Sequence, residues 1–447
     1  MTHLYKKFKL NPHIINYANT IFYQTKIHVL LSDYGFQSVR RAPFCSNSIR
    51  LGSALSERSV RRSLQLFPQA NLENGRFHTR RVTKQIGIWT WKRFFKTSPQ
   101  RFGFKQPTQK NQMLLLFTYL SGLIGAGLLT AIVFRQYSRM SRRAQGVEDI
   151  KIGHYGRRPH LFRYRGYVYP DYVINDLRSI HQFDSREDDV WVVSFPKSGT
   201  TWLQEIVYLV HNGVDTEKAA SGNIEERFPF FEWIYPGIKT LNNMASPRLL
   251  KTHLPLSMLP NDVKKKKPKI LYIARNPKDV VVSYYYFMTK YVIEDQLFSG
   301  TMEDYCQLFI DDLIFYGPWW KHVKEAWDRR EEGNILVLFY EDMQQDLRKA
   351  VLDVATFLNK PLTETQVDLI VQHCSFASMK DNKAVNYDWL KDVGAAKHNE
   401  NFMRKGQVGD WKNHLSQEVI EKLDEVVATK LTSYGVPIVD TLPSKPS

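Results

Sequence analysis

The chain has 447 residues, of which 24% are charged and 43% hydrophobic, a globular composition that excludes wholesale disorder, collagen and coiled coil. This length suits one large domain or two ordinary ones. Three cysteines (Cys45, Cys306 and Cys374) are too few for a disulfide framework, and no Asn-x-Ser/Thr sequon occurs, so a reducing compartment is favoured.

The net charge of +17 is confined to the N-terminal quarter. Residues 1–112 contain 20 Lys and Arg but only three acidic residues, whereas the rest of the chain contains 42 of each sign. Few acids, Arg pairs and interspersed serines are typical of a mitochondrial transit segment, and a basic tail on a membrane surface fits equally well. Nucleic-acid binding is a rival interpretation, but no nucleic-acid-binding motif accompanies it, so we expect no nucleic-acid partner. We expect a basic, largely irregular N-terminal segment.

A long apolar run follows this segment. Met113–Phe134 contains 22 residues without a charge, and at 1.5 Å per residue a helix of that length spans a hydrocarbon core of about 30 Å. The run predicts one transmembrane helix, because buried core helices, the alternative, are usually amphipathic. Five basic residues in each 20-residue flank leave its orientation open. We expect a linker over residues 135–150 and the catalytic domain over 151–447.

The first element of that domain resembles an anion cradle. The apolar run Val190–Phe195 predicts a buried strand, and apolar residues at helical spacing follow the loop Pro196–Trp202. A loop between strand and helix presents backbone N–H groups and a helix N-terminus to an anion; Gly199 permits close backbone approach and Lys197 adds charge. Because Lys197 precedes the only glycine, this is not a Walker A loop, and a nucleotide kinase is disfavoured.

A second element carries a cation and an imidazole. If Arg248–Pro255 is a strand, its period of two places Leu249, Lys251 and His253 on one face. The pair could serve as an electrophile and a base. The alternative is a solvated lysine beside a histidine with a satisfied hydrogen bond.

Two further segments add cations. The run Ile270–Ile273 predicts a strand that leads into a helix near Pro277, so that Arg275 and Ser283 could reach one anion. Near the C-terminus, two cations precede a glycine at residues 404–406, a pattern that is ordinarily a solvated charge pair.

Together these segments carry a family resemblance. Five motifs occur in order, FPKSGTTW, RLLKTHLP, ARNPKDVVVSYY, FYEDM and FMRKGQVGDWKNH. From about Val190 to Asp424 the chain resembles the cytosolic sulfotransferase family, whose members move a sulfonate from 3′-phosphoadenosine 5′-phosphosulfate (PAPS) to an acceptor hydroxyl or amine. The resemblance implies an α/β fold with a P-loop-like central parallel sheet flanked by helices.

The resemblance also implies a role for each matching residue. His253 would be the general base, and Lys197 and Lys251 would neutralise charge during transfer without a metal. The 5′-phosphosulfate would be held by Lys197, Ser198, Gly199, Thr200 and Thr201; the 3′-phosphate by Arg275, Ser283, Arg404, Lys405 and Gly406; the adenine by Trp202, Tyr340, Ser375 and Phe376; and the small-molecule acceptor by Phe230, Trp233, Lys251, His253 and Phe287. A donor with phosphates at two ends needs two anion sites, and the sequence offers two.

The chain also departs from the family. Its members usually begin shortly before the first strand, so residues 1–145 are extra. The family's dimer segment places Val where this chain has Gln417, between Lys412 and Glu421, so a homodimer stays open. A membrane-anchored nucleotide-binding scaffold without activity is the alternative function. We expect a membrane-anchored enzyme whose catalytic domain is cytoplasmic, with mitochondria as the alternative, and an irregular lid over residues 380–402.

Overall fold

The computed structural model describes residues 121, 131–133, 136–150, 161–290, 298–392 and 401–442. The chain divides into two units, residues 1–112 and 113–447, and every described residue lies in the second. The predicted basic segment therefore lies outside the described residues, as does most of the predicted span Met113–Phe134. The helices that the described residues form include none with the length and apolarity needed to cross a bilayer.

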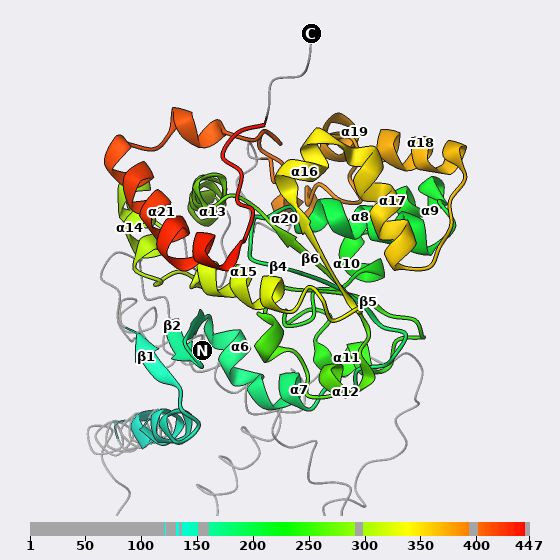
Figure 1. Cartoon of the computed structure of the whole chain (residues 1–447). Helices are drawn as coiled ribbons and strands as arrows, with labels where there is room; N and C mark the ends of the chain where they lie inside the picture. The colour runs from blue at the N-terminus through cyan, green and yellow to red at the C-terminus, as the bar shows by residue number, and fades with distance from the viewer. Residues whose placement is uncertain are drawn as a thin grey trace, which may run out of the picture. The chain divides into compact units, whose positions relative to one another are not determined.

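A four-stranded parallel sheet forms the centre of the domain (Figure 1). Its strands are β4 (Val190–Ser194), β5 (Leu249–Thr252), β6 (Lys269–Ala274) and β7 (Ile335–Phe339), in the order β5-β4-β6-β7. The expected α/β fold with a central parallel sheet is confirmed. After β4 the chain forms β5 on one side and then crosses to β6 on the other, so the strand order reverses beside β4. Ligand sites of open α/β sheets lie at such a point, beyond the carboxyl ends of the strands.

Strand β4 is buried on both faces, which explains its continuous apolar sequence. Trp191 and Val193 belong to one hydrophobic core, whereas Val190 and Val192 belong to the other. The first core lies against α13, α14, α15 and α21, and the second against α8, α17 and α18, so the sheet is the middle of three layers (Figure 1).

The helices vary from single turns to four turns. Their bounds are α6 Asp171–Asn175, α7 Leu177–His181, α8 Thr200–His211, α9 Thr216–Ser221, α10 Ile224–Arg227, α11 Ile238–Asn242, α12 Val263–Lys266, α13 Pro277–Lys290, α14 Met302–Ile310, α15 Trp319–Asp328, α16 Tyr340–Gln345, α17 Leu347–Phe357, α18 Glu364–His373, α19 Phe376–Asp381, α20 Trp389–Asp392 and α21 Gln417–Lys430, with 3₁₀ turns η2 Leu256–Met258, η3 Asp410–Asn413 and η4 Thr432–Tyr434. The expected irregular lid thus contains α20, and its residues 393–400 lie outside the described part.

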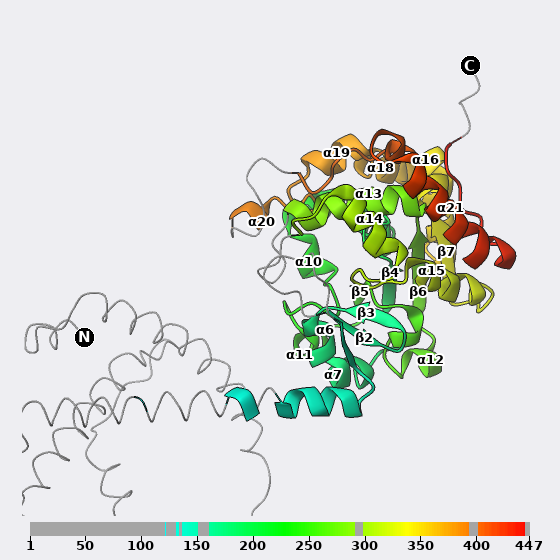
Figure 2. The same cartoon turned by 90° about the vertical axis from the view of Figure 1, so that its left-hand side faces the viewer.

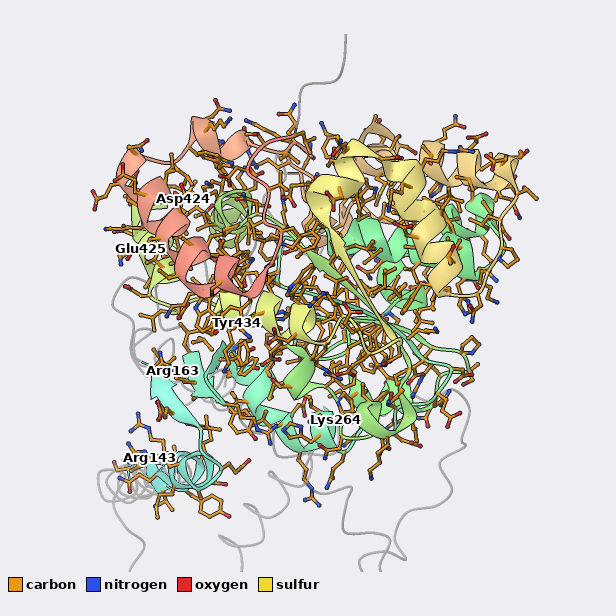
Figure 3. All side chains as sticks on the ribbon, in the orientation of Figure 1. Arg143, Arg163, Lys264, Asp424, Glu425 and Tyr434 are labelled. Atoms are coloured by element: carbon orange, nitrogen blue, oxygen red, sulfur yellow. The ribbon has the colours of Figure 1, made fainter. Side chains whose placement is uncertain are left out.

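Polar contacts attach α21 and the turn after it to α13 and α15. Lys278 Nζ, at the start of α13, lies 2.6 Å from Asp424 Oδ1 on α21. Trp327 Nε1 on α15 donates a hydrogen bond of 3.1 Å to the carbonyl oxygen of Tyr434 in η4, and the side chains of Asp424 and Tyr434 are labelled in Figure 3. The first contact holds α21 against α13, and the second holds η4 against α15.

A small antiparallel sheet begins earlier than the expected domain boundary. Its strands are β1 (Glu148–Ile150), β2 (Leu161–Tyr164) and β3 (Tyr167–Tyr169), and it lies with α6 and α7 at the end of the domain opposite α18 and α19 (Figure 2). The expected linker 135–150 therefore includes β1, and its residues 136–144 are helical. Arg142 ties this helix to the sheet, because its guanidinium lies 3.4 Å from Asp149 and 4.8 Å from the Phe162 ring.

A buried ion pair joins the beginnings of β4 and β5. The guanidinium of Arg248 donates two hydrogen bonds of 2.7 Å to Asp189, and both side chains are completely buried. Arg248 also donates to the carbonyl oxygens of Leu241 and Asp184. Four hydrogen bonds satisfy a charge that would otherwise be costly to bury.

We expect Arg248→Met to lower the free energy of unfolding by about 3–5 kcal/mol, because it leaves the Asp189 carboxylate buried without its partner. Urea denaturation followed by circular dichroism measures the change. The matched control is Arg329→Met, which removes a similar pair with Glu332 at the surface and should cost at most about 1 kcal/mol. Equal effects of the two substitutions would contradict the structural role of Arg248.

Candidate active site

The loop after β4 joins a strand to a helix, as the sequence predicts for the candidate anion cradle. Gly199 has φ +103°, and a Cβ there would lie 2.7 Å from Cδ2 of Tyr340, so the position requires glycine. Helix α8 begins at the next residue, Thr200, whose Oγ1 lies 2.6 Å from Ser194 Oγ. The unpaired N–H groups of the first turn of α8 therefore face the end of the sheet.

Lys197 lies between two aromatic rings. Its Nζ is 4.4 Å from the ring centroid of Phe287 and 4.1 Å from that of Phe402. Burial lowers the pKa of this ammonium to about 7, and the positive charges of Arg275 and Lys251 act in the same direction. No carboxylate of the described residues forms an ion pair with it, so a bound anion would supply the missing countercharge.

A second group of cations lies near this loop. The Arg275 guanidinium donates to the carbonyl oxygens of Lys197 and Gln407 and lies 4.1 Å from the Tyr340 ring centroid. Arg404 and Lys405 both bind Asp410, at 2.7 and 2.6 Å. Burial raises the pKa of Asp410, but hydrogen bonds from Lys405, Asn413 and Arg404 outweigh it and hold that pKa below its ordinary range. We name Arg275, Arg404 and Lys405 the cation cluster.

Buried polar atoms without a partner occur both in the loop after β4 and in the cation cluster. Ser198 Oγ in the cradle, and the Nε atoms of Arg275 and Arg404 in the cation cluster, have no hydrogen-bond partner among the described residues. Buried polar atoms are rarely left unpaired in a protein. Gly406 adds a close approach, since its φ is +65° and a Cβ would lie 2.1 Å from Cδ2 of Phe376. A ligand with acceptor oxygens at two ends fits this arrangement.

His253 is held rigidly at the end of β5. Its Nδ1 lies 2.9 Å from the carbonyl oxygen of Ser194, its backbone N–H donates to Glu232 Oε1, and its carbonyl oxygen lies 3.0 Å from His322 Nε2. If Nδ1 carries the proton, it donates a hydrogen bond to the carbonyl oxygen of Ser194, and Nε2 keeps its lone pair.

The surroundings of His253 keep its imidazole neutral. Burial is the main cause that lowers its pKa, to about 3, and the positive charge of Lys251 contributes. Burial also raises the pKa of Glu232, to about 7, although hydrogen bonds from Thr252 and His253 act against it. The imidazole is therefore an unprotonated base near neutral pH.

Lys251 differs from the solvated lysine of the alternative interpretation. Its Nζ donates to Glu225 Oε1 at 2.7 Å and to the Tyr387 hydroxyl at 2.9 Å. Burial lowers its pKa, but the charge of Glu225 and contacts with Tyr387 raise it more, to above the ordinary value. The ammonium also lies 4.6 Å from the Phe230 ring centroid.

A single cavity of about 770 Å³ connects these groups. It is lined by every residue to which the resemblance gave a role except Ser198 and Ser375. Ser375 instead caps α19 by accepting a hydrogen bond from the backbone N–H of Ser378. Among the described residues, no group of three or more His, Cys, Asp or Glu side chains could hold a metal ion.

Aromatic side chains form the part of the cavity around His253. The rings of Phe230 and Trp233 are stacked with centroids 5.9 Å apart, and Tyr172 contacts Trp233 edge to face at 5.1 Å. Such a wall suits an apolar small molecule. Sequence reasoning gave no role to many other lining residues, among them Tyr172, Glu225, Glu226, Tyr235, Tyr284, Phe315, Tyr316, Tyr387, Trp389 and Phe402. Phe402 alone had a signal, as the first residue of the FMRKG motif.

Comparison with known proteins gives a consistent result. Residues 187–435 match the family described as "Sulfotransferase domain". The chain is 41% identical to Sulfotransferase 1E1 of Bos taurus over 256 residues, which are 56% of this chain and 86% of that protein. It is 42% identical to Sulfotransferase 1 family member D1 of Rattus norvegicus over 263 residues, which are 58% of this chain and 88% of that protein.

Solved structures share the fold. A retinol dehydratase in complex with androsterone and the inactive cofactor PAP has a TM-score of 0.56 and 28% identity, covering 64% of this chain and 91% of that one. The mouse sulfotransferase SULT7A1 complexed with PAP has a TM-score of 0.50 and 30% identity, covering 61% of this chain and 94% of that one.

Proposed function

Because the chain belongs to the sulfotransferase family and is a sulfotransferase, we propose that it moves a sulfonate group from PAPS to a hydroxyl or amine of a small-molecule acceptor. One observation carries this proposal: the loop after β4 and the cation cluster line the same cavity as the neutral imidazole of His253. PAPS has anionic groups at two ends, which matches two separate cationic regions. PAP in two similar solved structures, and androsterone in one of them, support this choice of ligands.

The donor would span the two cationic regions. We propose that the 5′-phosphosulfate lies at the loop of Lys197 to Thr201 and at the start of α8. The 3′-phosphate would contact Arg275, Arg404 and the backbone at Gly406, with Ser283 on α13 as a further donor. The adenine would lie among Trp202, Tyr340 and Phe376; the rings of Trp202 and Tyr340 are 5.4 Å apart, and Trp202 Nε1 is fixed by the Cys374 carbonyl.

Catalysis would use the fixed positions of His253 and two lysines. His253 Nε2 takes the proton of the acceptor hydroxyl or amine as that atom attacks sulfur. Lys197 stabilises the oxygen that leaves with the nucleotide, and Lys251 stabilises the sulfonate oxygens in the transition state. The aromatic wall of Phe230, Trp233 and Phe287 orients the acceptor and excludes water.

We expect His253→Ala to lower kcat about 10²–10⁴-fold, because the general base is lost. The affinity for PAP should be nearly unchanged, since His253 lies outside the proposed nucleotide contacts. Transfer of label from ³⁵S-PAPS to 2-naphthol measures kcat, and calorimetry measures PAP affinity. The control is His211→Ala, at the C-terminal end of α8 and absent from the cavity lining. Normal turnover of His253→Ala would refute the assignment.

Arg275→Ala tests the 3′-phosphate site. We expect it to weaken binding of PAP by about 2–4 kcal/mol, because charge-assisted hydrogen bonds to the 3′-phosphate are lost. Binding of AMP, which lacks that phosphate, should change little. Calorimetric titration with both nucleotides gives the comparison, and equal losses for the two would show that Arg275 does not recognise the 3′-phosphate.

The membrane attachment remains a proposal from the sequence. We infer that residues 113–134 anchor the full chain, so that it stays in the membrane pellet after alkaline carbonate extraction. A chain shortened to begin at Gly146 should stay in the supernatant and keep its activity, because all donor-binding motifs follow that residue. Release of the full chain into the supernatant by carbonate would contradict the proposed membrane anchor.

The compartment of the catalytic domain is tested separately. We propose that it faces the cytosol, with the mitochondrial interior as the alternative if the basic segment acts as a transit sequence. Protease added to sealed organelles should digest the domain without detergent if it faces the cytosol. Protection of the domain would favour the mitochondrial alternative.

A further inference from the structure

A closed hydrogen-bonded triangle lies in the wall of the cavity. Glu225 Oε1 accepts from Lys251 Nζ at 2.7 Å and from the Tyr387 hydroxyl at 2.6 Å, while Tyr387 accepts from Lys251 at 2.9 Å. All three residues are buried, with exposed fractions of 6–8%. They come from α10, β5 and the segment between α19 and α20. Sequence reasoning gave a role to Lys251 alone.

The triangle leaves the ammonium one free donor. Lys251 Nζ carries three N–H bonds, and Glu225 and Tyr387 take two of them. Among the residues that the structure describes, no third hydrogen bond of this ammonium occurs. Since Lys251 and His253 line the same cavity, the remaining N–H is available to a ligand there.

Glu225 also orders the neighbouring aromatic wall. Its Oε2 accepts a hydrogen bond of 3.0 Å from the backbone N–H of Phe230. The Phe230 ring in turn lies 4.6 Å from Lys251 Nζ and contacts His253 edge to face at 5.1 Å. One carboxylate therefore holds both the cation and the ring that contacts the cation and the proposed base.

Comparison with Lys197 shows what the carboxylate does for a lysine in this cavity. Lys251 is buried and Lys197 is partly buried, but among the described residues only Lys251 has an acidic partner. The pKa of Lys197 is lowered to about 7 by burial and nearby cations, whereas that of Lys251 stays above its ordinary value because of Glu225. The charged or titratable groups that act on Lys251 are Glu225 and Tyr387 in the triangle and, across the cavity, Lys197 and His253.

We propose that Glu225, with Tyr387, is a positioning residue that keeps Lys251 charged and directs its remaining N–H toward the sulfonate oxygens during transfer. This inference rests on the proposed sulfonate transfer, because it assigns Glu225 a role in that same site. Glu225 acts through Lys251 and touches neither the donor nor the acceptor in this role. Tyr387 contributes a hydrogen bond but no charge, so its removal should have a smaller effect.

The test is the pH dependence of kcat in the full-length protein, with ³⁵S-PAPS as donor and 2-naphthol as acceptor. Glu225→Gln keeps the size of the side chain but removes its charge, so we expect the pKa of Lys251 to fall toward the value of about 7 found for Lys197. A cation that is required is lost as the pH rises through its pKa. In the complex with PAPS, the bound anion supplies the countercharge that Lys197 lacks in the free protein, so we expect the wild type to keep kcat between about pH 7 and 9. The variant should lose kcat over this range, by about tenfold or more at pH 9.

Two control variants make the result decisive. Glu217→Gln removes the same charge from α9, where the side chain is exposed and lies outside the cavity lining, and it should keep the wild-type pH profile. Tyr387→Phe should lower kcat less than Glu225→Gln without weakening PAP binding, and it tests the inference even if Glu225→Gln does not fold. A uniform loss of kcat at every pH, an unchanged profile in Glu225→Gln, or full activity in Tyr387→Phe when Glu225→Gln is unfolded would overturn the inference. Absence of label transfer by the wild type would instead refute the proposed function.

Discussion

Strand β4 is hydrogen-bonded in parallel on both edges, and the arrangement of the site depends on this constraint. Val193 lies opposite Thr252 of β5 and Tyr272 of β6, so the chain leaves all three strands at the same edge of the sheet. The loop with Lys197, the imidazole of His253 and the guanidinium of Arg275 follow these three strands directly. Their proximity is therefore a consequence of strand register, even though long connections separate them in the sequence. The ion pair of Arg248 with Asp189 secures the opposite end of β4 and β5.

The cavity concentrates positive charge, and the chain balances it in two ways. Lys251 is paired with Glu225, and Arg404 and Lys405 share Asp410, so each of these cations has a carboxylate partner within the protein. Lys197 and Arg275 instead lie against aromatic rings, which stabilise a cation less than a carboxylate does. Arg275 has Asp279 only at 3.9 Å. The two least neutralised cations thus occupy the two regions proposed for the phosphates of the donor, where a doubly anionic ligand gains most.

The proposed base and the cations are supported by residues whose own sequence contexts carry no motif. His322 on α15 bonds the carbonyl of His253 and the Tyr272 hydroxyl, and Glu232 bonds the backbone of His253. Tyr387 reaches Lys251 across 136 residues of sequence. These partners fix rotamers and protonation states, which decide whether a histidine is a base or a structural residue.

The sequence alone determined the family, the central parallel sheet and about half of the cavity lining, because short-range patterns encode them. A continuous run of apolar residues, without alternation, indicates the buried strand β4. The glycine that closely follows a lysine indicates the loop before α8, and the five motifs occur in the order expected of the family. The sequence did not indicate β1, since this strand is too short and too polar to be recognised before it pairs with β2. The roles given to Ser198 and Ser375 in the donor site stay predictions, and the cavity lining does not include these two residues. Only the tertiary structure decided that Lys251 is paired and Lys197 is not, because Glu225 and Tyr387 are brought to Lys251 by packing between separate elements, and no local pattern records which carboxylate a buried ammonium will meet.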